Sequence, residues 1–190
     1  MSELGRLPTI AIVGKKNSGK TTLLVALAAE LKRRGLRVVS LKHGHHEFEI
    51  DRRGADSWRH FHEGEVEAVL FVAAGKMALV SRLDDEEPDP ELLIERFFAG
   101  QGYDLVLVEG YKHSRLPKIE IHRMAVHERP IYDASDAAAA ALFLAVVTDD
   151  ASLVTSCPTF PLDPQNPAGS HMTAVADLVT DMIPRAERAG

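Results

Sequence analysis

Apolar residues fall into short β-branched runs that alternate along the chain with longer stretches at helical spacing. The first run covers residues 9–13, and the stretch after it, residues 19–34, places its leucines mostly three or four positions apart. A second run at residues 36–42 completes a strand–helix–strand unit, which favours a right-handed parallel crossover. This alternation predicts an α/β fold built on a mostly parallel sheet.

The same two patterns predict the other elements. Strands are expected at residues 66–73, 77–83, 104–110, 117–123, 142–147 and 158–162. Helices are expected at residues 55–63, 90–99 and 172–183, and residues 135–141 are expected to be helical or turn-like. The sequence has no internal repeat and no linker long enough to divide it, so we expect one domain over residues 1–190.

The segment between the first strand and the first helix reads GKKNSGKT and matches the pattern G-x-x-x-x-G-K-[ST]. Its glycines let backbone N–H groups surround an anion, and the start of a helix adds a positive dipole end. Lys20 is expected to reach the β- and γ-phosphates of a nucleotide, and the Thr21 hydroxyl to bind Mg²⁺. An ordinary glycine-rich turn is the alternative, but the strand–loop–helix context favours a phosphate-binding loop (P-loop). The expected nucleotide-binding residues are Gly14, Lys15, Asn17, Ser18, Gly19, Lys20, Thr21 and Thr22.

A P-loop protein also needs a carboxylate at the end of a neighbouring strand, where it holds Mg²⁺ directly or through water. Glu109 ends the apolar run at residues 105–108 and suits this role, although a strand-end glutamate could instead form an ion pair. Asp51, after the second strand, is a further candidate that could bind the metal or position the attacking water. Asp104 comes before this apolar run and would lie at the wrong end of the sheet. These positions predict a three-layer P-loop NTPase sandwich with a small β insertion and with Lys20, Glu109 and Asp51 as catalytic residues.

Composition narrows the class of protein. The 190 residues carry a formal net charge of -6, which argues against binding of nucleic acid through a broad basic surface. The single cysteine, Cys157, allows no intramolecular disulfide and no zinc cluster, as expected in the reducing cytoplasm. No apolar run reaches the roughly 18 residues of a membrane span, and residues 1–7 do not resemble a secretory signal. We expect a cytoplasmic protein without nucleic-acid or membrane partners.

Three histidines, His43, His45 and His46, follow the second strand. With Cys157 they suggest a transition-metal site, but a site of that kind usually needs more thiolate ligands than this sequence offers. The alternation of acidic and apolar residues at 47–50 fits a strand more simply. The favoured interpretation places Lys42 and His43 against the phosphates or a second substrate.

Several separated motifs, taken in order, resemble those of one known family. They are the P-loop extended to Leu23, Lys42-His43 with His46, Asp51 with Asp56-Ser57, Val108-Glu109-Gly110-Tyr111-Lys112, residues 117–123 and residues 145–149. The series is similar to that of the MobB family, the molybdopterin-guanine dinucleotide biosynthesis adaptor proteins. The tail at residues 152–190 departs from it.

The resemblance implies a GTP-binding homodimer of the bacterial or archaeal cytoplasm with weak Mg²⁺-dependent GTPase activity. It would assist the nucleotidyltransferase MobA, which joins a GMP moiety to molybdopterin, and molybdopterin itself is a further candidate partner. Asp149 could accept hydrogen bonds from the guanine N1–H and 2-amino groups. Lys15 could reach the phosphates of a dimer partner or be an ordinary solvated lysine. Lys112 and Arg123 could bind a pterin phosphate or MobA, or be surface charges.

Two other functions stay open. A P-loop kinase of a small metabolite would need an arginine-rich lid, and Arg52, Arg53 and Arg59 come closest to one. A pure adapter would use GTP only to order the dimer, without hydrolysis.

Overall fold

The computed structural model describes residues 6–44, 49–83, 88–163, 165–166, 169 and 171–184. The chain forms two compact units, the first made of Met1–His43 with Pro90–Gly190 and the second of Gly44–Asp89. The second unit is thus inserted between two parts of the first. The prediction of one domain over the whole chain stays a prediction.

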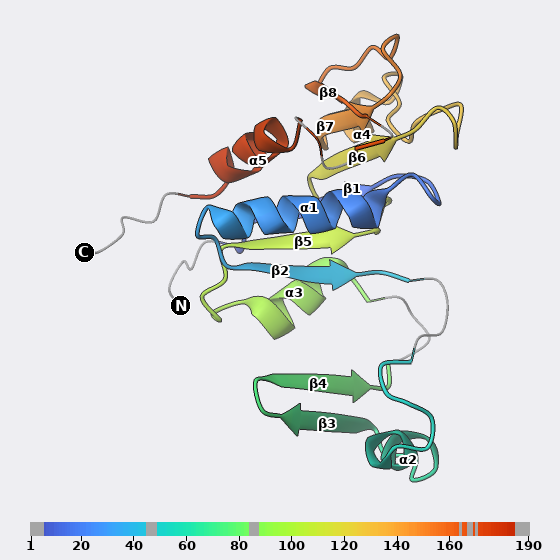
Figure 1. Ribbon diagram of the computed structural model, residues 1–190, viewed down its shortest axis with the longest axis vertical. Coiled ribbons are helices and arrows are strands. Elements are labelled where there is room, and N and C mark those ends of the chain that lie inside the picture. Colours follow the sequence, from blue (N-terminus) through green and yellow to red (C-terminus); the bar gives the residue numbers. More distant parts are fainter. Residues whose placement is uncertain are drawn as a thin grey trace, which may run out of the picture. The chain divides into compact units, whose positions relative to one another are not determined.

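The first unit is built on a six-stranded sheet with the order β2-β5-β1-β6-β7-β8, and every pairing in it is parallel. The carboxyl ends of its strands therefore meet at one edge, toward which the arrows of β2 and β5 point in Figure 1. The strands are β1 (Thr9–Val13), β2 (Val38–Lys42), β5 (Leu105–Glu109), β6 (Lys118–His122), β7 (Phe143–Thr148) and β8 (Thr159–Pro161).

Helices cover both faces of this sheet and make three layers (Figure 1). They are α1 (Lys20–Arg33), α3 (Pro90–Phe98), α4 (Ala137–Ala140) and α5 (His171–Asp181). Residues of α1 and α5 share a core with Ile10 and Ile12 of β1, and residues of α3 and α4 share the other core with Ala11 and Val13. Successive residues of a strand point to opposite faces, so one strand serves two cores. The predicted α/β sandwich is confirmed.

The second unit carries the small β insertion that the sequence predicts. It consists of a helix followed by an antiparallel hairpin, namely α2 (Asp56–His62), β3 (Ala68–Ala73) and β4 (Lys76–Ser81). In the two-residue hairpin turn, Gly75 takes a positive φ of 79°, a conformation that glycine adopts readily. Arg82 links helix and hairpin, because its Nη2 donates to the Phe61 carbonyl oxygen at 2.8 Å.

Predicted and observed boundaries agree to within two residues for most elements. The largest differences lie at element ends, as at Arg37, which was expected in β2. The Arg37 N–H donates to Asp104 Oδ2 at 2.6 Å instead of to a neighbouring strand. His45 and His46, with half of the strand expected at residues 47–50, lie outside the described residues, and Glu49 and Ile50 are not in a strand.

None of the helices in the described part of the chain combines the length and the apolar character needed to cross a membrane.

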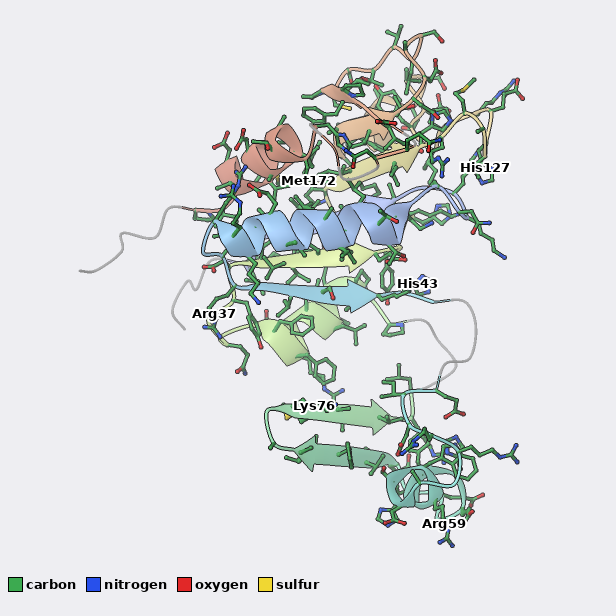
Figure 2. All side chains as sticks on the ribbon, in the orientation of Figure 1. Arg37, His43, Arg59, Lys76, His127 and Met172 are labelled. Atoms are coloured by element: carbon green, nitrogen blue, oxygen red, sulfur yellow. The ribbon has the colours of Figure 1, made fainter. Side chains whose placement is uncertain are left out.

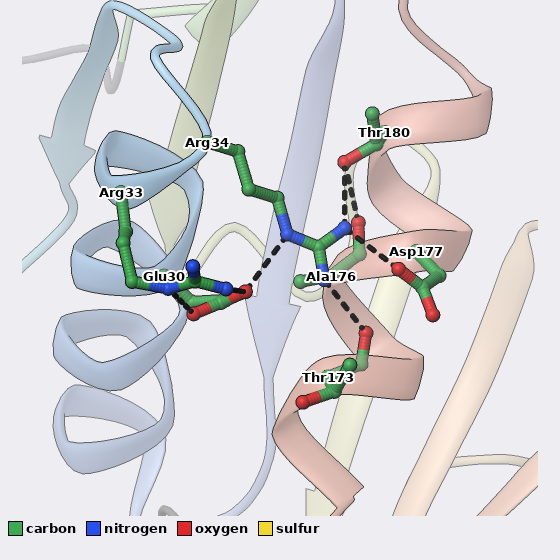
Figure 3. A network of polar contacts seen from close by, with 7 residues as sticks. All are labelled: Glu30, Arg33, Arg34, Thr173, Ala176, Asp177 and Thr180. Carbon is green, nitrogen blue, oxygen red and sulfur yellow. Dashed lines mark hydrogen bonds and ion pairs between the residues drawn. The ribbon is translucent and has the colours of Figure 1, made fainter.

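An arginine at the end of α1 ties this helix to α5 (Figure 3). Arg34 Nε donates to Glu30 Oε1 at 2.9 Å, and its Nη1 donates to Asp177 Oδ1 at 2.7 Å. Arg33 adds two hydrogen bonds to Glu30, at 2.8 and 2.7 Å. The bonds from Arg33 and then those from Arg34 lower the pKa of Glu30 from 4.5 to about 2. Glu30 therefore makes these bonds as an anion throughout the ordinary pH range.

Glu30→Gln should lower the melting temperature at pH 7, because a neutral amide cannot hold two guanidinium groups as a carboxylate does. A group whose pKa falls on folding adds stability above its unfolded pKa, here near 4.5, and loses that stability as the pH falls toward about 2. The difference in melting temperature between wild type and variant should therefore shrink over this window and stay constant above it. Circular dichroism at several pH values measures this difference. Glu95→Gln on the exposed side of α3 is the control, and a difference that persists undiminished at pH 2 would contradict the prediction.

Candidate functional site

The loop between β1 and α1 takes a shape that depends on its glycines. Gly14 has a φ of 152°, and a Cβ there would lie 2.5 Å from both the Ile121 carbonyl oxygen and Ser18 Oγ. Gly19, the N-cap of α1, has a φ of 106°. Asn17 has a φ of 63°, which is uncommon for residues other than glycine. The spacing of the motif thus matches the backbone that an anion-binding loop needs.

Two side chains of the loop are placed for an anionic ligand. Lys20 Nζ donates to the Lys15 carbonyl oxygen at 2.9 Å, which folds the lysine back over the loop. Ser18 is only 1% exposed, and its Oγ has no hydrogen-bond partner among the described residues. A buried hydroxyl without a partner costs about 1–3 kcal/mol. A ligand oxygen in the loop is the kind of partner that would remove this cost.

The predicted acid reaches the same place. Glu109 ends β5 in register with Ile12 of β1 and is 8% exposed. Thr21 Oγ1 lies 3.0 Å from both carboxylate oxygens of Glu109, to which it donates. On the other side of β5, Lys42 ends β2 in register with Glu109 and places its Nζ 3.2 Å from Oε1. The structure thus brings Thr21, Glu109 and Lys42 together.

Positive charge exceeds negative charge around Glu109. Burial lowers the pKa of Lys20; the Glu109 carboxylate opposes this shift, and the charges of Lys42 and Lys112 add to it. Three lysines therefore act electrostatically on one site that contains one carboxylate. A cluster with this balance attracts a polyphosphate, whose oxygens supply the missing negative charge.

The oxygen atoms of Thr21 and Glu109 fit a magnesium ion. Mg²⁺ takes oxygen ligands at about 2.0–2.1 Å in octahedral geometry, so that adjacent ligands lie about 2.9 Å apart. The distance of 3.0 Å between Thr21 Oγ1 and Glu109 Oε1 matches this spacing. Water and phosphate oxygens would complete the coordination, as is usual for this ion. Across the residues that the structure describes, no group of three or more His, Cys, Asp or Glu side chains could hold a metal.

A sharp turn after β5 lets His43 lie against the end of this strand (Figure 2). The His43 N–H donates to the Glu109 carbonyl oxygen at 2.9 Å, and the His43 and Tyr111 ring centroids are 4.5 Å apart. Gly110 has a φ of 104°, and a Cβ there would come within 3.1 Å of the His43 Cβ. The positive φ of Gly110 and the close approach of His43 both disfavour a side chain at this position.

Three further predicted residues have other neighbours in this structure. Lys15 Nζ donates to the Arg129 carbonyl oxygen at 2.7 Å, and Asp149 Oδ1 accepts a hydrogen bond from the Met124 N–H at 2.7 Å. Thr22 is exposed on the first turn of α1. Their contacts with a nucleotide stay predictions.

Asp51 belongs to the second unit. Its carboxylate accepts hydrogen bonds from the Ser57 hydroxyl and from the Arg52 N–H, the latter at 2.8 Å. The bond from Ser57 is the main reason that the pKa of Asp51 is lowered. Its role at the metal or the attacking water stays a prediction.

Two buried charges on β6 escape prediction from the sequence. Glu120 is 1% exposed and accepts hydrogen bonds from the N–H groups of Ile131 and Tyr132, at 2.6 and 2.8 Å. Burial raises its pKa although these bonds oppose the shift. Lys118 is 3% exposed, and burial lowers its pKa. The alternation Lys-Ile-Glu-Ile-His is typical of a strand with one solvated face, but an inner strand of a parallel sheet is covered on both.

Comparisons with known proteins agree with one another. The family model of MobB, described as molybdopterin guanine dinucleotide synthesis protein B, matches residues 9–149. The molybdopterin-guanine dinucleotide biosynthesis adapter protein of Haemophilus influenzae is 39% identical over 120 residues, which make up 62% of this chain and 65% of that protein. The adapter protein of Escherichia coli is 33% identical over 124 residues, which make up 65% of this chain and 70% of that protein. The first match thus spans slightly less than two thirds of its relative.

Solved structures are similar over more of the chain. A MobB protein homolog from Bacillus stearothermophilus has a TM-score of 0.60 and 25% identity, with 91% of this chain and 98% of that chain covered. Bacillus subtilis MobB has a TM-score of 0.64 and 24% identity, with 94% and 99% covered. The similarity of fold therefore extends beyond the residues that the family model matches.

Gly14→Ala should destabilise the protein by about 2–4 kcal/mol, because the added Cβ meets the Ile121 backbone, which no rotamer change can move. Gly35→Ala is the matched control, since Gly35 also has a positive φ, 85°, but has nothing within 4 Å of an added Cβ. The control should cost only about 1–2 kcal/mol. Chemical denaturation measures both free energies of unfolding. Equal losses would show that close approach to Ile121 is not what requires Gly14.

Proposed function

The chain belongs to the MobB family, whose model matches residues 9–149, and we propose that it acts as an adapter in molybdopterin guanine dinucleotide biosynthesis. In this role it binds GTP with Mg²⁺, hydrolyses the GTP slowly and assists a MobA-type nucleotidyltransferase in the cytoplasm. The observation that carries the proposal is the 3.0 Å contact between Thr21 and Glu109. It joins the hydroxyl of the P-loop to the strand-end acid at a site rich in lysine.

Each part of a bound nucleotide–metal complex has residues to hold it. The N–H groups of the loop and Lys20 would bind the β- and γ-phosphates. Thr21 and Glu109 would hold Mg²⁺, which would supply positive charge to neutralise the phosphates. Lys42, 3.2 Å from Glu109, adds positive charge beside them.

Slow hydrolysis follows from the groups available. Fast P-loop GTPases use a glutamine to orient water and an arginine finger to stabilise the transition state. The sequence holds two glutamines, and neither lies in the loop directly after β1, β2 or β5. Gln101 comes just before β5, and Gln165 comes after β8. Lysines alone would neutralise charge without orienting the water.

Selection of guanine is assigned to Asp149. It follows β7 at the carboxyl edge of the sheet, where ligands of such folds bind. A carboxylate can accept from both guanine donors, whereas adenine offers no N1–H and no 2-amino group. Its Oδ1 holds the Met124 N–H at 2.7 Å, so base binding would share or replace that bond.

The second part of the proposal is that cationic side chains of this protein bind an anionic partner. Arg123 follows β6, and its buried Nε has no hydrogen-bond partner among the described residues. Lys112 is exposed after β5. Both side chains suit the phosphate of a molybdopterin or an acidic surface of a MobA-type partner.

We also propose that the protein is a homodimer that associates through the second unit. The β3–β4 hairpin exposes Val72 to 65% and Met77 to 74%, and these residues face each other in the ladder. Leu70 and Leu79, which also pair with each other, are exposed on the same face of the hairpin. Contiguous exposed apolar residues mark interaction surfaces, and a two-stranded hairpin gains stability when such a surface is covered.

Lys20→Ala should weaken GTP binding about 10- to 100-fold, because it removes charge-assisted hydrogen bonds to phosphate. Titration calorimetry with Mg²⁺ should also show that the wild type binds GTP more tightly than ATP. Lys16→Ala removes the same charge from an exposed position of the loop and is the matched control. Equal affinity for GTP and ATP, or unchanged binding by Lys20→Ala, would contradict the proposal.

A single-turnover assay with the same proteins separates the remaining functions. Phosphate released from GTP without an acceptor supports a slow GTPase. Release no faster than the uncatalysed rate points to an adapter that does not hydrolyse GTP, and a phosphorylated acceptor points to a kinase.

Met77→Glu should shift the dimer to a monomer, because it places a charge in the proposed interface, and the dimer dissociation constant should rise about tenfold or more. Light scattering coupled to size-exclusion chromatography measures the mass. Leu92→Glu on α3, where Leu92 is 70% exposed, is the control and should leave the mass unchanged. A wild type that is monomeric at all concentrations would refute the interface.

A further inference from the structure

The loop that follows β6 is hydrogen-bonded to the P-loop. This loop, residues 123–132, is here called the clasp. His127, which Figure 2 labels on it, lies with its Nε2 2.9 Å from the Lys16 carbonyl oxygen. Lys15 Nζ donates to the Arg129 carbonyl oxygen at 2.7 Å, which makes a second connection. The P-loop is therefore bonded to the clasp at two consecutive residues.

The clasp is itself anchored to two strands of the sheet. The buried Glu120 of β6 accepts hydrogen bonds from the N–H groups of Ile131 and Tyr132. At the other end of the clasp, the Met124 N–H donates to Asp149 Oδ1. Hydrogen bonds at both ends therefore restrain the position of this loop.

A buried histidine connects these anchors to His127. His122, 2% exposed, places its Nε2 2.8 Å from the His127 carbonyl oxygen and its Nδ1 2.9 Å from Thr148 Oγ1. A carbonyl oxygen can only accept, so His122 Nε2 carries a proton. For the same reason His127 Nε2 donates to Lys16. The chain of bonds therefore runs from the end of β7 through β6 to the P-loop.

The bond to Lys16 acts on the part of the loop that faces the ligand. In a trans peptide the C=O and the following N–H point in opposite directions. A donor that holds the Lys16 carbonyl oxygen therefore aims the Asn17 N–H away from the clasp. Asn17 takes a φ of 63°, a conformation that needs such support in a residue with a side chain.

We propose that the clasp fixes the P-loop in its anion-binding shape, with His127 as the positioning residue for the Lys16–Asn17 peptide and His122 as its anchor. The inference rests on the proposed nucleotide function for its effect on GTP, but the support of the loop does not require a nucleotide. Asp149 holds the clasp at Met124, and Thr148 contacts its anchor His122, so the clasp also connects the proposed base-recognition end of the site to the phosphate end.

Three variants test the clasp. His127→Ala removes the donor, His127→Gln restores an N–H donor of similar reach, and His60→Ala removes an exposed histidine from α2 as a control. In the nucleotide-free protein, His127→Ala should speed hydrogen exchange of the amides at residues 15–19 by about 2- to 10-fold, since a net hydrogen bond is lost. It should weaken Mg²⁺–GTP binding by a similar factor. His127→Gln should recover most of both losses, and His60→Ala should change neither.

The two readouts separate the clasp from the nucleotide function. Faster exchange with unchanged GTP affinity, or a glutamine variant as defective as the alanine variant, would overturn the positioning role. A wild type that binds no GTP while His127→Ala still speeds exchange would overturn the proposed function and support the hold of the clasp on the loop.

Discussion

The candidate site depends on one constraint of the sheet, the position of β5 between β1 and β2. In the sheet β5 pairs with both β1 and β2, although β5 comes much later in the sequence. All three strands run parallel. Glu109 therefore lies in register with Ile12 on one side and with Lys42 on the other. The P-loop continues from β1, so the acid meets Thr21 and Lys42 at the same edge. A strand order with β2 directly beside β1 would separate the carboxylate from one of them.

This constraint explains which parts of the site could be predicted from sequence. The P-loop has a fixed spacing and a local context, and Glu109 ends an apolar run, so both could be found from neighbouring residues alone. The pairing of Lys42 with Glu109 could not, because it requires the strand order. The hydrogen bonds of Glu120 could not be predicted either, because its partners are the N–H groups of Ile131 and Tyr132, which lie in a later loop. Most element boundaries were predictable because hydrophobic periodicity is local, whereas the arrangement of the elements is not.

The buried charges of β6 show how the same edge is kept rigid. Desolvation of Lys118 and Glu120 disfavours their charged forms, as the directions of their pKa shifts show. A strand of apolar residues would be simpler to bury, but it would offer the loops after β6 nothing to bond. Glu120 instead fixes two backbone N–H groups of the clasp. In some proteins, buried polar groups specify one arrangement rather than add stability.

The hydrogen bonds of Lys20 and Thr21 also affect how tightly the proposed nucleotide would bind. The Lys15 carbonyl oxygen already accepts a hydrogen bond from Lys20, and the Glu109 carboxylate accepts one from Thr21. For the proposed nucleotide, binding is thus an exchange of partners, and each contact contributes only the difference between new and old bonds. When the product leaves, Lys20 and Thr21 would bond again to the Lys15 carbonyl oxygen and to Glu109, so neither side chain would lack a hydrogen-bond partner. Under the proposed function, these existing bonds would therefore limit the affinity for the nucleotide.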